Sequence, residues 1–444
     1  MKTLMLTAMH SGAGKTVLSC AVMAALKKRG ARVQAFKCGP DYIDPMFHSR
    51  VLGVPSRNLD LFLQGEAGVR KTLSRADADV AVLEGAMGYY DGLNGTDTAS
   101  AYAVSRLLKT PAILVLLPKG QGLTLAAQVR GMLDFRPESR IEALLLADCA
   151  STTASSLGPI LTRETGLPVL GFLPPMEAAR WESRHLGLKT AAEIDDLRER
   201  IEALADQAEK SVDLDALLAL AGEWTEKERA PQTPVRCRIA VAQDAAFCFL
   251  YEDNLDVLRE SGAELRFFSP LHDSALPEAD GLYLPGGYPE LHAAALSENT
   301  AMRESIAAAV RAGLPTVAEC GGFLYLGRSL EGTDGKAHPM CGVLPGMGVR
   351  TDRLQRFGYQ TLEAPADSLL FRAGEAIPAH EFHYWDTTEN GAALLARKAD
   401  GRSWPCGYVT GRLYAAFPHL HFGGETPLAK RFVEACSAWK NSKN

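Results

Sequence analysis

The sequence predicts an α/β protein with two domains, and three observations support this fold class. Short runs rich in Val, Ile and Leu alternate with helical patterns in both halves of the chain, which is typical of parallel sheets covered by helices. A Gly-rich loop lies directly between the first apolar run and the first helical pattern. A polar, Pro-containing stretch separates the two halves, and the 444 residues are enough for about two or three domains.

In the N-terminal half, the first expected strand is Thr3–Ala8. One helix is expected from about Lys15 to Arg29, where Gly30 is suited to end it. The further apolar runs have the pattern of strands buried on both faces; they are Val33–Lys37, Val80–Glu84, Ile113–Pro118, Ala143–Ala147 and Val169–Leu173. We expect one parallel sheet with helices on both sides.

The second half repeats this alternation. Helices are expected near Tyr251–Ser261 and Met302–Ala312. The strand-like runs are Arg238–Ala242, Glu264–Phe268, Gly281–Leu284 and Thr316–Ala318. Two later segments, Glu381–Trp385 and Leu413–Phe417, are expected as antiparallel additions.

Between the halves, Ile194–Ala221 is charged and rich in Leu and Ala, which favours a helix. The stretch GEWTEKERAPQTPVR that follows has the composition of a linker. We therefore expect a first domain over residues 1–190, a helical and linker segment over 191–236, and a second domain over 237–444.

Composition narrows the class of protein. The net charge of -6 and the absence of a basic stripe give no reason to expect a nucleic-acid partner. No apolar run reaches the roughly 18 residues that a membrane-crossing helix needs. The nine cysteines show neither CxxC nor paired metal spacing, so we expect a reducing, cytoplasmic setting. The oligomeric state stays open, with a homodimer as one alternative.

The first chemical motif is the Gly-rich loop between strand and helix, which is the context of an ATP-binding P-loop. Its glycines allow backbone N–H groups to approach phosphate oxygens, and Met9 stands where the strict pattern has Gly. Lys15 is expected to reach the β- and γ-phosphates, and Thr16 to bind Mg²⁺. The expected ATP-binding residues are Ser11, Gly12, Ala13, Gly14, Lys15 and Thr16.

Two acidic segments follow neighbouring strands, KCGPDYIDP after the Val33 run and EGAMGYYDG after the Val80 run. Ligands of open α/β sheets bind at the carboxyl ends of strands, so these segments can meet in one crevice. Oxygen ligands suit Mg²⁺, and we expect Asp41 and Glu84 to join Thr16 as metal or metal-water ligands. Tyr42, Asp44 and Asp91 are candidates for the substrate or acyl-phosphate site.

In the second half, Cys320 lies where an apolar strand ends and a helix begins, in AECGGF. A nucleophile on such a turn is exposed beside backbone N–H groups, and a helix N-terminus lowers the pKa of a thiol. The other cysteines, such as Cys20 and Cys149, lie in or beside apolar runs and are expected in the core.

A cysteine nucleophile needs a base, and the segment FPHLHF near the C-terminus supplies candidates. His419 is our first candidate and His421 the second, since alternation along an extended segment places both on one face. Gly286 and Gly287 follow another strand in LPGGYPE and are expected to direct N–H groups toward an oxyanion. The cluster HEFHYWD is expected to be structural or near the substrate.

Taken together, these motifs resemble the cobyrinate a,c-diamide synthase family of cobalamin biosynthesis over nearly the whole chain. The first half contributes SGAGKT, KCGPDYIDPMFH, NLDLFL, EGAMGYYDG and SRHLGL; the second contributes DAAFCFLYEDNL, FFSPLHD, LYLPGGYPE, AECGGFLYL, HEFHYWD and FPHLHF. LYLPGGYPE and GPDYIDPMFH are the specific signals.

The resemblance implies an N-terminal P-loop domain like that of dethiobiotin synthetase and a C-terminal class I glutamine amidotransferase domain without the usual full triad. It also implies that the a and c carboxylates of cobyrinate, a tetrapyrrole acid, become amides through an acyl phosphate. The implied partners are ATP, Mg²⁺ and L-glutamine, from which Cys320 and His419 release ammonia.

Alternatives stay open at this stage. The same chemistry could act on hydrogenobyrinate, which lacks cobalt, or on nickel-sirohydrochlorin; cobyric acid synthase matches KCGPDYIDPMFH and the C-terminal ending less well. A different class is a regulatory P-loop ATPase with an inactive amidotransferase domain, which intact Cys320 and His419 argue against. A ligase that uses free ammonia would be unaffected by loss of Cys320.

Overall fold

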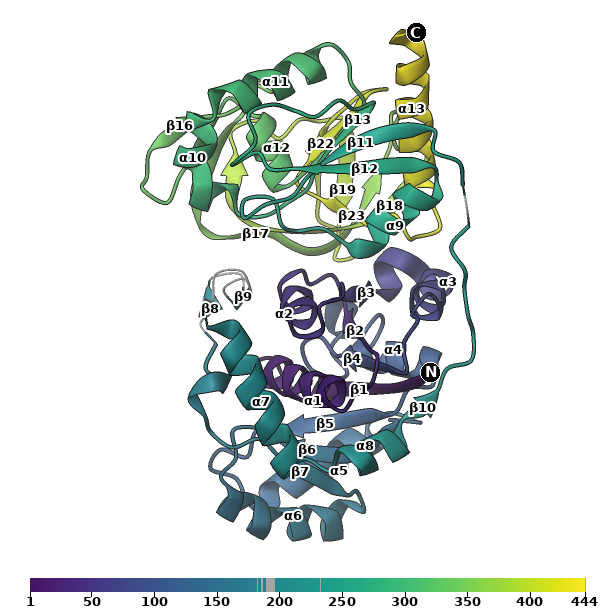
Figure 1. The fold of residues 1–444 in the computed structure, drawn as a ribbon, viewed down its shortest axis with the longest axis vertical. Coiled ribbons are helices and arrows are strands. Elements are labelled where there is room, and N and C mark those ends of the chain that lie inside the picture. The colour runs from purple at the N-terminus through teal and green to yellow at the C-terminus, as the bar shows by residue number, and fades with distance from the viewer. Residues whose placement is uncertain (182, 185–186, 189–195, 232, 444) are drawn as a thin grey trace. The chain divides into compact units, whose positions relative to one another are not determined.

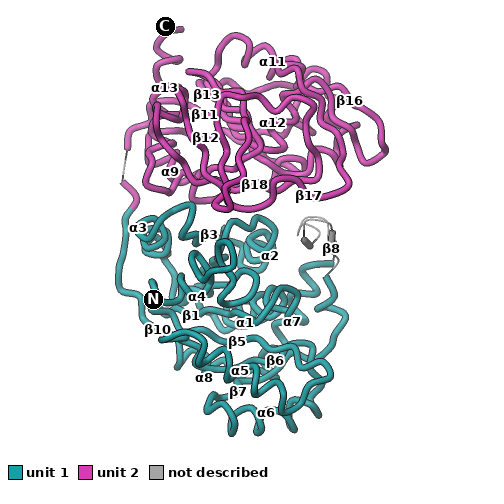
Figure 2. The backbone as a smooth tube through the Cα atoms, turned by 180° about the vertical axis from the view of Figure 1, so that it is seen from behind, with its two compact units in different colours: residues 1–229 teal, residues 230–444 magenta. Residues whose placement is uncertain are grey.

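The computed structural model describes residues 1–181, 183–184, 187–188, 196–231 and 233–443. The chain divides into two compact units, Met1–Arg229 and Ala230–Asn444 (Figure 2). In the part of the chain that the structure describes, no helix is long and apolar enough to cross a membrane.

The first unit is built on one sheet of order β3-β2-β4-β1-β5-β6-β7, and all of these strands run parallel (Figure 1). A short antiparallel strand, β10 (Gly222–Glu223), pairs with β1. The parallel strands are β1 (Lys2–Ala8), β2 (Val33–Cys38), β3 (Arg57–Leu59), β4 (Val80–Glu84), β5 (Ala112–Leu116), β6 (Ile141–Leu146) and β7 (Val169–Phe172). The predicted parallel sheet is therefore confirmed.

Helices cover both faces of this sheet. Met5 belongs to the core formed with α3, α4, α5 and α6, whereas α1 packs on the other face beside α7. The helices are α1 (Lys15–Lys28), α2 (Ile43–Leu52), α3 (Leu61–Ser74), α4 (Ala101–Leu108), α5 (Leu123–Asp134), α6 (Ser151–Thr165), α7 (Leu197–Ser211) and α8 (Leu214–Leu220). Short elements complete the unit: η1 (Leu93–Gly95), η2 (Glu177–Ala179), β8 (Ser183–Arg184) and β9 (Gly187–Leu188).

The helical stretch expected after residue 190 corresponds to α7 and α8, which belong to the first unit through contacts with α1 and β7. Residues 191–195, where that stretch was expected to begin, lie outside the described residues. Of the motif SRHLGL (183–188), the structure describes only the backbone of β8 and β9.

The second unit has a mainly parallel sheet of order β12-β11-β13-β14-β22-β21. Its strands are β11 (Cys237–Ala242), β12 (Ala263–Phe268), β13 (Gly281–Leu284), β14 (Thr316–Glu319), β21 (Tyr408–Val409) and β22 (Leu413–Ala416). Helices α9 (Glu252–Glu260) and α13 (Leu428–Lys443) pack in the core on one face. Helices α10 (Ala293–Glu298), α11 (Thr300–Arg311) and α12 (Gly321–Leu326), with η4 (Pro289–His292), belong to the other face.

A second, mostly antiparallel sheet adjoins this core, with the order β16-β15-β17-β18-β23 and with β19 and β20 attached to β17. Its strands are β15 (Ser329–Glu331), β16 (Ala337–Pro339), β17 (Met347–Glu363), β18 (Ala376–Thr387), β19 (Leu394–Arg397), β20 (Ser403–Cys406) and β23 (His419–Leu420). The antiparallel expectation is confirmed for Glu381–Trp385, which lies in β18.

The antiparallel expectation is wrong for Leu413–Phe417. The strand Leu413–Ala416 runs parallel to β14, with Glu319 opposite Ala416, and only the short β21 pairs with it in the antiparallel sense. The physical reason is burial: three of its four residues are buried, as in a strand enclosed on both faces of a parallel sheet.

Candidate functional site

The phosphate loop joins the end of β1 to the start of α1 in the first unit. Gly12 and Gly14 have φ values of 78° and 84°, a region that favours glycine. A Cβ at Gly14 would also lie 3.1 Å from the Cβ of Ala147 at the end of β6. The first turn of α1 follows directly, so its N–H groups and helix dipole face an anion placed in the loop.

Lys15 lies across this loop. Its Nζ donates to the carbonyl oxygens of His10 at 3.1 Å and Met87 at 2.6 Å, which ties the loop to the EGAMGYYDG segment after β4. Burial, followed by the charge of nearby Lys37, lowers the pKa of Lys15 to about 8. An anion between the two lysines would relieve this repulsion, so the pair is suited to phosphate.

A buried network of charges lies at the carboxyl ends of β2 and β4. Glu84 accepts from Lys37 Nζ at 2.8 Å, from His48 Nε2 at 2.7 Å and from Thr16 Oγ1 at 2.8 Å. Burial opposes the ionised forms, but Lys37 and His48 lower the pKa of Glu84 well below its usual range. Asp44, whose Oδ2 lies 2.5 Å from Lys37 Nζ, and Glu84 raise the pKa of Lys37 against the effect of burial.

The structure places the other predicted acidic residues around this network. Asp41 Oδ1 accepts from the backbone N–H groups of Ile43 and Asp44, at 2.8 and 3.4 Å, and so caps the start of α2. Asp91 Oδ2 accepts from Gly88 N at 2.9 Å, and Tyr42 is buried. Of the candidates, Asp44 and Glu84 are brought together by Lys37, whereas Asp91 shapes the loop after β4.

The oxygen atoms around Thr16 fit Mg²⁺. Thr16 Oγ1 and Glu84 Oε1 meet at 2.8 Å and offer hard oxygen donors beside the phosphate loop. Within the described ranges, no group of three or more His, Cys, Asp or Glu side chains could hold a metal ion by itself. A magnesium ion here would therefore depend on phosphate oxygens and water for its remaining ligands.

Lys37 and His48 are functional candidates that the motifs do not single out. Both lie in KCGPDYIDPMFH, and they are 3% and 0% exposed. A signal was present, because a Lys at the end of a strand as apolar as VQAFKC is almost never buried without a partner. The partner, Glu84, lies 47 residues further along the chain, and only the fold reveals this pairing.

In the second unit, Cys320 occupies a sharp turn between β14 and α12. Its φ of 48° is strained for a residue other than glycine. The neighbouring glycines are required by close packing: a Cβ at Gly322 would lie 2.2 Å from Leu284 O, and one at Gly321 would lie 2.9 Å from Pro289 Cδ. Cys320 therefore lies on the strand-to-helix turn that the sequence predicts, and its role as the nucleophile stays a prediction.

Gly286 lies between Cys320 and His419. A Cβ at Gly286 would be 2.5 Å from His419 Cε1 and 3.4 Å from Cys320 Cβ, so the thiol and the imidazole line the same space. The His421 ring packs against Tyr251 instead, with 4.9 Å between ring centroids. β23 ends at Leu420, so regular strand alternation is not assigned at His421, and the choice of His419 rather than His421 as the base stays a prediction.

Burial sets the protonation of this pair. Burial, followed by the charges of Glu290 and Glu381, raises the pKa of the Cys320 thiol, so the expected lowering by the helix N-terminus is overridden. Burial also lowers the pKa of His419 to about 3. Burial thus disfavours the charged forms of both side chains in this arrangement.

The two glycines after β13 lie against this turn. The Gly286 carbonyl accepts from Phe249 N at 3.0 Å, and Gly287 N lies 3.1 Å from the position that a Cβ of Gly321 would take. Gly287 has no room for a side chain, because a Cβ there would lie 2.1 Å from Ala246 O. The Gly287 nitrogen therefore lies against the turn that follows Cys320, and its role toward an oxyanion stays a prediction.

The HEFHYWD cluster forms a buried charge network beside this site. Glu381 accepts from His383 Nε2 and Arg356 Nε, both at 2.8 Å, and from Gln360 Nε2 at 2.7 Å. His383 stacks on Phe417 with centroids 3.8 Å apart, and Phe382 stacks on His419 with centroids 5.6 Å apart. The cluster thus ties β17 and β18 to the segment that carries His419.

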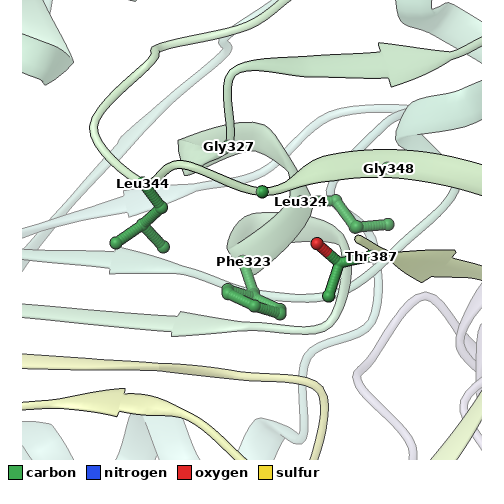
Figure 3. A pocket seen from close by; sticks show the side chains of 7 residues that line it. Phe323, Leu324, Gly327, Leu344, Gly348 and Thr387 are labelled. Carbon is green, nitrogen blue, oxygen red and sulfur yellow. The ribbon is translucent and has the colours of Figure 1, made fainter. Parts of the chain in front are cut away.

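A separate pocket lies beside α12, with an empty volume of about 190 Å³ (Figure 3). Thr387 contributes its one polar side chain, and glycine backbone and apolar groups form the rest; the lining residues are Phe323, Leu324, Gly327, Leu344, Gly346, Gly348 and Thr387. The residues that line the pocket include neither Cys320 nor a charged side chain, so the pocket is not part of the Cys320 site.

Comparison with known protein families shows the class of protein to which this chain belongs. Residues 4–188 match the CobQ/CobB/MinD/ParA nucleotide binding domain, and residues 238–427 match the CobB/CobQ-like glutamine amidotransferase domain. A nucleotide-binding domain and a glutamine amidotransferase domain on one chain are the parts of a glutamine-dependent amidating ligase.

The most similar relatives identify the family. The chain is 42% identical over 439 residues to cobyrinate a,c-diamide synthase of Listeria innocua, covering 95% of this chain and 96% of the relative. It is 38% identical to the enzyme of that name from Clostridium tetani, covering 98% and 100%, and 40% identical to that from Streptococcus sanguinis, covering 98% and 99%. The chain belongs to the cobyrinate a,c-diamide synthase family of cobalamin biosynthesis.

Proposed function

We propose that this enzyme uses ATP and glutamine to convert the a and c carboxylates of cobyrinate into amides, with an acyl phosphate as the activated intermediate. The observation that carries the proposal is the pairing of Cys320 with His419 across Gly286, on a chain whose other unit places two buried lysines at a phosphate loop. The names of the relatives supply the substrate.

For the glutaminase half of the reaction, the proposal is supported by the closeness of Cys320 and the His419 ring to Gly286. Cys320 Sγ attacks the side-chain carbonyl carbon of glutamine while His419 takes the thiol proton. Backbone N–H groups at Gly287 and the following turn stabilise the oxyanion. His419 then returns the proton to the leaving nitrogen, so that ammonia departs and a thioester remains. Water cleaves the thioester to glutamate and restores the thiol.

The synthetase half needs ATP because a carboxylate has oxide as its leaving group. In our proposal a carboxylate oxygen of the macrocycle attacks the γ-phosphorus and ADP leaves, which gives an acyl phosphate. Lys15 and Lys37 neutralise the transferred phosphoryl group, and positioning with charge neutralisation dominates such transfers. Mg²⁺, held through Thr16 and Glu84, would neutralise the phosphate oxygens. Ammonia then displaces phosphate from the acyl carbon, and two rounds give the a,c-diamide.

Asp44, Tyr42 and Asp91 keep their proposed place at the substrate or acyl-phosphate side of this site. The support is strongest for Asp44, because Lys37 Nζ donates hydrogen bonds to both Asp44 and Glu84. We also propose a cytoplasmic location, which the nine free cysteines support; a homodimer remains a prediction.

The test is a product-mass assay with purified protein, MgATP and glutamine, and with cobyrinate, hydrogenobyrinate and nickel-sirohydrochlorin in separate reactions. We expect two carboxyl-to-amide conversions on cobyrinate that depend on glutamine and ATP. Amidation of another macrocycle alone would keep the mechanism and replace the substrate. Folded, ATP-binding protein that amidates none of them would contradict the proposal and favour the regulatory ATPase.

A further inference from the structure

Glu319 is a buried carboxyl group that the proposed mechanism does not use. It directly precedes Cys320 at the end of β14 and is 1% exposed. Burial, against the hydrogen bonds from Leu420 and Tyr283, raises its pKa to about 8. Burying a carboxyl group carries a large desolvation cost, so its presence beside the nucleophile requires an explanation.

The contacts of Glu319 lead to the segment that carries His419. Its Oε1 accepts from Leu420 N at 3.0 Å, and its Oε2 accepts from Tyr283 Oη–H at 2.9 Å. Tyr283 lies on β13, next to β14 in the sheet. One side chain thus connects the strand that ends at the nucleophile with the backbone next to the histidine.

Other side chains fix the same backbone. Asn254 Nδ2 donates to Leu420 O at 2.8 Å, Phe422 N donates to Asn254 Oδ1 at 2.6 Å, and Tyr414 Oη donates to Pro418 O at 2.8 Å. Asn254 Nδ2 also lies 3.4 Å from Tyr283 Oη, which joins this contact to Glu319 through the tyrosine. Together these bonds hold the main chain on both sides of His419.

This support matters because β23 is short. It consists of His419 and Leu420, paired with His380 and Ala379 of β18. So short a ladder specifies register weakly, and a slip of one residue would exchange the direction of every side chain. In the wrong register His419 would no longer face Gly286 and Cys320.

We propose that Glu319 is a positioning residue of the glutaminase site: through its bond to Leu420 N it holds His419 in register with Cys320. The inference rests on the proposed function. This role explains why a carboxyl group is buried directly before Cys320. Its hydrogen-bond partner, Leu420, lies between His419 and His421 in the sequence. Glu319 touches neither glutamine nor the reacting atoms in this proposal; it acts through the backbone that carries His419.

The test compares three variants of the full-length enzyme in glutamine hydrolysis. Glu319→Leu removes both acceptors, and we expect kcat to fall about 10- to 100-fold, because small misplacements of catalytic groups have effects of this size. Glutamine KM should change by less than about threefold, since the substrate contacts remain. Glu319→Gln keeps an acceptor for Leu420 N and can donate to Tyr283 Oη, so kcat should stay within about threefold of wild type.

Tyr283→Phe is the third variant. It removes one hydroxyl group that orients Glu319 and keeps the ring, so we expect a kcat between those of wild type and Glu319→Leu, with unchanged KM. Circular dichroism and thermal unfolding accompany each assay, because a smaller folded fraction would also lower the apparent kcat at unchanged KM; kcat is therefore calculated per folded enzyme. The decisive signature is loss in Glu319→Leu with rescue in Glu319→Gln.

The outcomes separate this inference from the proposed function. Wild-type hydrolysis that Cys320→Ala abolishes establishes the glutaminase site; no difference between those two proteins contradicts the proposed function and the positioning role with it. With the glutaminase established, wild-type kcat in folded Glu319→Leu overturns the positioning role alone. If Glu319→Leu does not fold, wild-type kcat in Tyr283→Phe overturns it.

Discussion

The candidate sites of the two units differ in the charge of their buried side chains. In the first unit, the buried Lys37 forms an ion pair with Glu84, which also shares a hydrogen bond with His48 Nε2 beside the phosphate loop. In the second unit, burial keeps Cys320 and His419 uncharged. A site for phosphates needs fixed positive charge, whereas a neutral thiol and imidazole depend on their mutual position. We therefore expect the first site to lose activity when a charged side chain is removed. We expect the second site to lose activity when Cys320 or His419 is removed or shifted.

The largest expected effect is a loss of the activity of the second unit without a loss of the activity of the first. Cys320→Ala removes the nucleophile, so glutamine-dependent amidation should fall on the order of 10³-fold or more. Amidation supported by added ammonium chloride should persist, because the first unit keeps its charges. Product mass measured with each nitrogen source checks this. Cys341→Ala, at another buried cysteine of the same unit, is the matched control, and loss of both activities in Cys320→Ala would refute the division of labour.

A substitution in the first unit should have the reverse effect, a loss of amidation with glutamine hydrolysis retained. Lys15→Met removes one of the two cations at the phosphate loop, and amidation should fall about 10²- to 10³-fold with either nitrogen source. Glutamine hydrolysis by Cys320 should remain. Glutamate release and amide formation, measured in the same samples, test this.

Lys28→Met is the control for Lys15→Met, since it changes an exposed lysine at the far end of the same helix. Amidation that survives in Lys15→Met would show that the loop does not hold the transferred phosphate.

The third effect discriminates between the two histidines. His419→Gln should lower the kcat of glutamine hydrolysis about 10²-fold, because general-base assistance contributes at least this much. His421→Gln should stay within about threefold, since His421 packs against Tyr251, whereas the atoms nearest to a Cβ at Gly286 belong to His419 and Cys320. Steady-state kinetics of both variants decide the matter, and the opposite ranking would make His421 the base.

These contrasts also show what the sequence could predict. Strands such as Val80–Glu84 and Gly281–Leu284 agree with the structure at both ends, because buried parallel strands have continuous apolar runs. The turn at Cys320 was also predictable, since strand, nucleophile and small residues are adjacent in sequence. The residues that form these strands and this turn are close together in the sequence, so a local sequence pattern is enough to predict them.

Long-range pairing was the part that sequence could not supply. The bonds from Lys37 to Glu84 and from Glu319 to Leu420 N span 47 and 101 residues. The suppressed ionisation of Cys320 depends on packing from several elements, and the helix N-terminus alone suggests the opposite shift. The parallel setting of Leu413–Ala416 likewise depends on its neighbours in the sheet.

The smallest expected effect concerns acid stability in the second unit. Burial lowers the pKa of His380 and His419 to about 3 and that of His421 to about 4. Because these folded-state values lie below the usual 6.5, the unfolded chain binds more protons below that pH. The stabilising contribution is complete above about pH 6.5 and is lost as pH falls toward the folded-state values, by at most about 1.4 kcal/mol per pH unit for each histidine.

Urea unfolding of the full chain at pH 7, 6 and 5, followed by circular dichroism, measures this dependence. His380→Gln should reduce the loss of stability between pH 7 and pH 5, because the substituted side chain cannot take up a proton in the unfolded state. His272→Gln, at an exposed histidine of the same unit, should leave the pH dependence as in wild type. Equal pH dependence in His380→Gln and wild type would mean that His380 takes up its proton equally in the folded and unfolded chain, which would contradict the lowering of its pKa by burial.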